Sequence, residues 1–162
     1  ERIQAAMLFD GAHRAGRKAE ADAAAKGLGR LKDPRAVIAL SEYLARNERA
    51  AADSVLRALG ELGDPSAMRY VLPLLFDRDG YVRVSSARTL ARLGDPEALP
   101  HLRAALDTEL VNARVGALRA IASFGDRAKH LIPDLAKLAQ DASAPEEVRL
   151  AAQRAARDVR GD

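Results

Sequence analysis

The stretch Leu59-Gly60-Glu61-Leu62-Gly63-Asp64-Pro65 recurs along the chain with small changes. Equivalent segments begin at Leu28, Leu90 and Ile121. Their aspartates stand 31 residues apart: Asp33, Asp64, Asp95 and Asp126. A fixed period of about 20–50 residues is typical of repeat proteins, in which each unit buries its apolar face against its neighbours. The sequence therefore predicts a repeat array.

Each recurrence contains the signals that end one helix and begin the next. Gly63 suits the left-handed backbone conformation that closes a helix, because glycine has no Cβ to clash there. Asp64 is predicted to cap the following helix through its carboxylate, with Pro65 in the first turn. The same three residue types return as Gly94-Asp95-Pro96. Consecutive helices are therefore expected to fold back tightly on each other.

A second break divides each unit into two segments with helical apolar spacing. In the third unit, Arg78-Asp79-Gly80 separates residues 65–76 from residues 81–93. Each unit is therefore predicted to be a helical hairpin, which makes the chain all-α with about five hairpins and about ten helices. The repeats are placed approximately at residues 1–32, 33–63, 64–94, 95–125 and 126–162, as one array over residues 1–162.

The composition agrees with this prediction and excludes several classes of protein. The chain has 162 residues, of which 48% are hydrophobic and 30% charged, with no Cys and no Trp. The absence of cysteine excludes disulfides, zinc fingers and a thiolate nucleophile. The longest apolar run, residues 70–76, is far shorter than the roughly 20 residues of a membrane helix. We expect a cytoplasmic protein, and a first residue other than Met suggests a fragment of a longer one.

Two stretches carry a resemblance to a known family. Residues 94–102, and residues 77–83 followed by Ala87 and Leu90, resemble HEAT-like repeats, most of all the short repeats named after phycobilisome bilin lyases. The resemblance extends over essentially the whole chain. It implies an α-solenoid, a right-handed superhelix in which the first helix of each hairpin lies outside and the second lines a concave face.

Enzymes built on the resembled fold have residues that this chain lacks. HEAT-like diiron hydroxylases bind their metal through His-Glu pairs, whereas none of His13, His101 and His130 is followed by glutamate. HEAT-like DNA glycosylases grip a damaged nucleotide with tryptophan. We therefore expect no catalytic residues, no metal site and no cofactor. A bilin-lyase-like activity remains an alternative.

One position in successive second helices is always basic. Its occupants are Lys26, Arg57, Arg88, Arg119 and Arg154. The position lies roughly 200° around the helix from the apolar stripe, so we expect these side chains to form a ladder on the solvent side of the concave face. Arg92 extends the ladder by one turn. Val84, Val115 and Leu150 each precede a ladder arginine by four residues and are expected to be exposed beside it.

The ladder suggests a partner. Arginine beside aliphatic side chains is typical of hot spots in protein recognition. We therefore predict a protein–protein interaction scaffold that binds an acidic segment of another protein on the concave face, with no membrane partner. Binding of a nucleic-acid phosphate backbone is the alternative partner, and a purely solubilising ladder is the third reading. A second basic column, Arg83, Arg114 and Arg149, is predicted to be structural and paired with loop acids such as Asp79.

Overall fold

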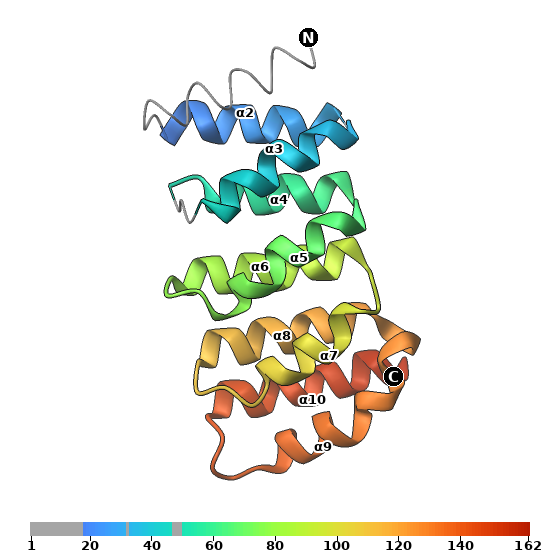
Figure 1. The fold of residues 1–162 in the computed structure, drawn as a ribbon. Helices are drawn as coiled ribbons and strands as arrows, with labels where there is room; N and C mark the ends of the chain where they lie inside the picture. The colour runs from blue at the N-terminus through green and yellow to red at the C-terminus, as the bar shows by residue number, and fades with distance from the viewer. Residues whose placement is uncertain (1–17, 32, 47–49) are drawn as a thin grey trace. The chain divides into compact units, whose positions relative to one another are not determined.

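The computed structural model describes residues 18–31, 33–46 and 50–162. They contain helices and loops but no strand. The chain divides into two compact units, residues 1–71 and 72–162. Figure 1 shows the helices of both units. The first helix expected in the first repeat falls within residues 1–17 and so lies outside the described residues.

The described helices of the N-terminal unit are α2 (Lys18–Leu31), α3 (Pro34–Ala45), α4 (Ala52–Leu62), the short 3-10 helix η1 (Pro65–Ala67) and α5 (Met68–Val71). Helices α2 and α4 pack side by side, and α3 packs against both of them. A Cβ on Gly29 would lie only 2.9 Å from the Cα of Ala58. Glycine therefore permits the close approach of α2 to α4.

The C-terminal unit contains η2 (Leu72–Phe76), α6 (Gly80–Leu93), α7 (Ala98–Ala105), α8 (Val111–Ser123), η3 (Gly125–Leu131), α9 (Ile132–Gln140) and α10 (Glu146–Arg160). Helices α6, α8 and α10 lie side by side with α8 in the middle (Figure 1). On one side of this layer, η2 packs on α6, α7 on α8, and α9 on α10. The unit is therefore built from helical hairpins, as the sequence predicts.

The predicted helix junctions are confirmed by their backbone geometry. Gly63 and Gly94 close their helices in the left-handed region, with φ of 69° and 66°. At the first two junctions the N-cap residues Asp33 and Asp64 accept a hydrogen bond through Oδ1 from the backbone N–H two residues later, over 3.0 and 2.9 Å. Asp95 makes the same bond over 2.9 Å, but the N-cap of α7 is Glu97. The recurrence of one bond at a spacing of 31 residues is the structural counterpart of the sequence period.

The last junction is built differently, because Arg127 stands where the earlier junctions have proline. The chain continues from Gly125 as the 3-10 helix η3. Arg127 Nη1 donates a hydrogen bond of 2.7 Å to the carbonyl of Gly94, and its guanidinium lies 5.1 Å from the ring centroid of Phe124. The substitution thus links the end of α6 to the start of η3.

The apolar stripe predicted from the repeats forms the core. Leu59, Leu90 and Ile121, which occupy equivalent positions, are completely buried. The layer between the helices is filled mainly by leucine, valine and alanine, and alanine allows the helices to approach closely. Within the described ranges, no helix is long and apolar enough to cross a membrane.

Candidate partner-binding site

The basic residues of the predicted ladder are exposed in both units. Lys26 and Arg57 lie on the packed helices α2 and α4 of the N-terminal unit. Arg88, Arg119 and Arg154 lie on α6, α8 and α10 of the C-terminal unit. The structure brings these last three together pairwise, because Arg88 and Arg119 line one groove and Arg119 and Arg154 line the next.

The groove between α6 and α8, which we call the arginine groove, has a volume of about 280 Å³. Its floor is apolar, and its charged lining residues are Arg88, Arg92 and Arg119. None of its lining residues in the described part of the chain is Asp or Glu. Within the same part of the chain, the three guanidinium groups form no hydrogen bond or ion pair. The arginine groove therefore presents positive charge that the protein itself leaves uncompensated.

Small side chains open this groove. Its floor is formed by Val84 and Ala91 of α6 and by Gly116 and Ala120 of α8. A Cβ on Gly116 would lie 3.2 Å from the Cβ of Ala87 and 3.7 Å from the Cα of Val84, so the two helix backbones approach closely at this point. The groove results because alanine and glycine leave space that larger side chains would fill.

The neighbouring groove, between α8 and α10, is larger but less basic. Its volume is about 380 Å³, and Arg119, Arg154 and Leu150 contribute to its lining. Glu147 and Asp158 line it as well, so its two arginines are matched by two carboxylates. The electrostatic attraction for an anionic partner is therefore weaker here than in the arginine groove.

The apolar residues expected beside the ladder differ in their exposure. Leu150 is 45% exposed, as predicted, and Val84 is half-buried. Val115 is only 5% exposed, so the expectation that it is exposed is wrong, although it does line the groove between α8 and α10. The reason is its position on α8, which packs against α6 on one side and α10 on the other. Sequence spacing cannot distinguish a central helix from one at the end of a layer.

In the second basic column, Arg83 is held by the protein through partners other than the predicted Asp79. Arg83 Nη1 donates to the backbone carbonyls of Asp77 and Arg78 over 2.7 and 3.1 Å. The Asp79 carboxylate instead accepts a hydrogen bond of 2.8 Å from the backbone N–H of Tyr81. The expected pairing of Arg83 with Asp79 is therefore wrong, while the bonds to the loop carbonyls are those of a structural residue.

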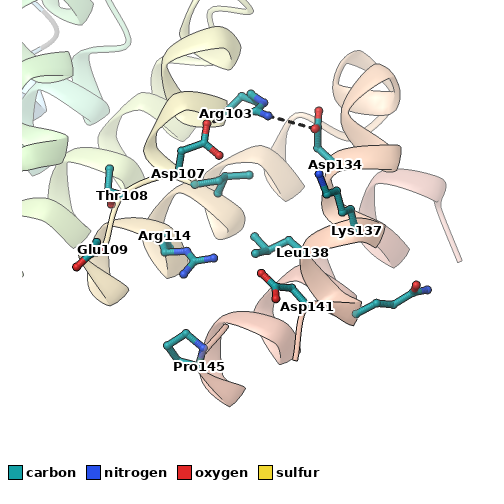
Figure 2. A pocket seen from close by; sticks show the side chains of 12 residues that line it. Arg103, Asp107, Thr108, Glu109, Arg114, Asp134, Lys137, Leu138, Asp141 and Pro145 are labelled. Carbon is teal, nitrogen blue, oxygen red and sulfur yellow. Dashed lines mark hydrogen bonds and ion pairs between the residues drawn. The ribbon is translucent and has the colours of Figure 1, made fainter. Parts of the chain in front are cut away.

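A larger pocket, with a volume of about 810 Å³, was not predicted from the sequence. It lies between the α7–α8 loop and the α9–α10 loop (Figure 2). Arg103 reaches both Asp107 and Asp134, and its Nη2–Oδ1 distance to Asp134 is 3.3 Å. The hydrogen bond to Asp107 is the main cause that raises the pKa of Arg103, followed by the charges of Asp107 and Asp134.

A second pair of opposite charges faces into the same pocket. Figure 2 shows the side chains of Arg114 and Asp141 approaching each other across it. Hydrogen bonds from the Ser143 hydroxyl and backbone N–H lower the pKa of Asp141, and the charge of Arg114 lowers it further. The cations of this pocket are thus largely matched by its own carboxylates. We therefore place the candidate site at the smaller arginine groove.

Part of the lining of the arginine groove could have been recognised from the sequence. Gly116, Ala120 and Ser123 all line the groove and follow the spacing of one helix face. A stripe of small residues beside an exposed arginine predicts a depression only if a second helix lies next to it. The neighbouring helix is α6, and only the tertiary structure shows that it packs against α8.

Comparisons with known proteins agree on the type of repeat. Residues 47–114 match the family model of HEAT repeats, and residues 21–46 match that of the PBS lyase HEAT-like repeat. No curated protein matches the sequence at a significant level. The structure of the complex of CpcE and CpcF of phycocyanin lyase from Nostoc sp. PCC7120 is similar, with 28% identity and a TM-score of 0.70. The match covers 89% of this chain and 60% of that one, so this chain spans less than two thirds of its relative.

A second solved structure supports the fold alone. It is the crystal structure of an engineered protein with 20% identity and a TM-score of 0.59, and the match covers 96% of this chain and 79% of that one. The helical hairpins, the recurring junctions and the two family matches lead to the same result. The chain is a HEAT-like repeat protein with an all-α solenoid fold.

Proposed function

We propose that the chain is a non-enzymatic protein-binding module that holds an acidic segment of another protein at the arginine groove. The observation that carries this proposal is the set of three arginines around an apolar floor, with no carboxylate in the lining of the described groove. Arginine matches carboxylate geometry through its planar fork of N–H donors. The similar structure of CpcE with CpcF is a complex of two proteins, which supports a role in protein binding.

Charge alone would bind such a partner weakly. An exposed ion pair contributes about 0.2–1 kcal/mol, so three pairs leave a modest, salt-sensitive affinity. The apolar floor adds a second contribution, because burying an aliphatic group contributes about 25 cal/mol per Å² of apolar surface removed from water. Both contributions are available together in the arginine groove, which favours it over the groove between α8 and α10.

Two other functions give different experimental signatures. Binding of a nucleic-acid backbone by the same arginines would weaken steeply with added salt and would be insensitive to sequence. The similarity to a phycocyanin lyase structure supports a second candidate, a bilin-lyase-like activity. That activity requires a bound tetrapyrrole, so a chromophore that co-purifies with the protein from its native host would support it.

The proposal is tested with a labelled polyglutamate peptide and a single-stranded DNA of equal charge, each titrated at two salt concentrations. We expect the peptide to bind wild-type protein and to lose binding in the double variant Arg88→Glu with Arg119→Glu. The matched control is Arg78→Glu with Arg160→Glu, which alters the net charge equally at two exposed arginines outside the groove.

The control variant shows whether peptide binding depends on the arginines of the groove or only on the net charge of the protein. Retained peptide binding in the control variant supports the arginine groove as the site. Equal loss in both double variants, or tighter binding of DNA with a steep salt dependence, would refute the proposal. Circular dichroism of each variant checks that the helical fold is intact.

A further inference from the structure

The arginine groove is a small site with an apolar floor. Pockets for small-molecule ligands usually enclose about 300–1,000 Å³. The arginine groove, at about 280 Å³, lies just below this range. Its floor of Val84, Ala91, Gly116 and Ala120 offers aliphatic contact and no charged group. The groove therefore has room for an apolar side chain the size of leucine.

The arginines lie on both sides of this floor. Arg88 and Arg92 are four residues apart on α6, so they lie on one face of that helix. Arg119 lies across the floor on α8. Two like charges at this spacing repel each other, and an anionic partner on that side relieves the repulsion. A complementary ligand would therefore have an apolar group with an acidic group on each side of it.

We infer that the arginine groove recognises a protein segment in which one leucine-sized side chain is flanked on both sides by acidic residues. The apolar side chain enters between α6 and α8, one acidic group meets Arg88 and Arg92, and another meets Arg119. This inference rests on the proposed function and adds the apolar anchor to it. Ala91 is then a specificity-determining residue, because its small side chain leaves the space that the anchor fills.

The probe is a pair of short synthetic peptides with glutamates on both sides of a central leucine or alanine. Titration calorimetry should show the leucine peptide binding about tenfold more tightly to wild-type protein, since it buries the additional carbon atoms. The leucine side chain of Ala91→Leu would occupy the groove. The affinity of the leucine peptide should therefore fall to that of the alanine peptide. Ala104→Leu, at an exposed position of α7 outside the groove, is the matched control and should leave both affinities unchanged.

A second variant keeps the test decisive if Ala91→Leu fails to fold. Val84→Ala enlarges the floor without adding atoms, so it should shift the preference from a central leucine towards a central phenylalanine. A third peptide with a central phenylalanine measures this shift. An unchanged order of peptide affinities in Val84→Ala would overturn the apolar anchor, whether or not Ala91→Leu folds.

The two levels of the hypothesis fail in different ways. Equal affinity of the leucine and alanine peptides, with both lost in Arg88→Glu with Arg119→Glu, overturns the anchor and leaves the proposed function standing. Peptide binding that is indifferent to these arginines overturns both. Preferential, steeply salt-dependent binding of single-stranded DNA overturns both as well, because a nucleic-acid backbone offers no apolar side chain.

Discussion

Arg103 Nη2 lies 3.3 Å from Oδ1 of Asp134, a residue 31 positions further along the chain. This separation equals the period of the repeats, so the ion pair joins one hairpin to the next. The same guanidinium is bound by Asp107, next to the C-terminal end of α7. Arg103 therefore holds α7, its following loop and α9 together at one point.

The first prediction concerns this link. Arg103→Ala and Asp134→Ala should each lower the free energy of unfolding, and their double-mutant cycle should give a coupling of about 0.2–1 kcal/mol. The magnitude is limited because the two side chains are 38% and 40% exposed, so water screens the pair. Urea unfolding of the four proteins measures the coupling.

The control for this cycle is the pair Lys129–Asp126, which lies within η3 at 2.9 Å and is more exposed. Its coupling should be smaller, because it does not join two helices and its side chains are 52% and 84% exposed. A coupling between Arg103 and Asp134 that is indistinguishable from zero would contradict the assigned link.

The second prediction contrasts two glycines of α2. Gly27→Ala should raise the stability by about 0.5–1 kcal/mol, since alanine is the better helix former and its Cβ meets no atom within 4 Å. Gly29→Ala should lower the stability by about 1–3 kcal/mol, because its Cβ would lie 2.9 Å from the Cα of Ala58. Thermal unfolding of both variants checks the opposite signs, and shifts of equal sign would show that α2 and α4 are not in close contact.

The third prediction concerns the loop between α3 and α4. The hydroxyl of Tyr43 accepts a hydrogen bond of 2.7 Å from the backbone N–H of Ala51, and Tyr43 is only 2% exposed. Tyr43→Phe should cost about 1–3 kcal/mol, because the buried N–H loses its acceptor. Tyr81→Phe is the control, since Tyr81 is 84% exposed, and should change the stability by less than about 0.5 kcal/mol. Chemical unfolding measures both, and equal effects would argue against the hydrogen bond.

The fourth prediction is a pH dependence. The pKa of Asp141 is lowered from its ordinary value of 3.8, mainly by the hydrogen bond from the Ser143 hydroxyl. A lowered pKa means that folding favours the ionised carboxylate, so its stabilisation is complete above the ordinary pKa and is lost as the pH falls through the lowered one. Asp141→Ala should therefore be less stable than wild type at pH 7, and the difference should shrink as the pH falls below the ordinary pKa of the carboxyl group.

Thermal unfolding of wild type and Asp141→Ala across this pH range gives the comparison. Ser143→Ala removes the donor hydroxyl and should reproduce part of the loss at pH 7. A stability difference that stays constant from neutral to acidic pH would exclude the carboxylate as its origin.

Much of the fold could be predicted from the sequence, because its signals are local. Gly94 adopts the predicted left-handed conformation, and Asp64 caps through its carboxylate as expected. These features depend only on residues within one turn of the chain, so they recur wherever the residues recur. The exposure of the ladder arginines was predictable for the same reason, since the helical period fixes the angle between a residue and the buried stripe.

The candidate site was predictable only in part. Helical spacing predicted Arg88 and Arg119 as site residues. It also predicted that Val115 is exposed, which is wrong, and it assigned no role to Ala91 and Gly116. Whether a side chain on α8 is covered depends on the helices on either side of it. The sequence alone therefore determined the repeat, the helix boundaries and the exposed arginines. The tertiary structure decided which arginines share a groove, because that depends on how closely Gly116 allows α8 to approach α6.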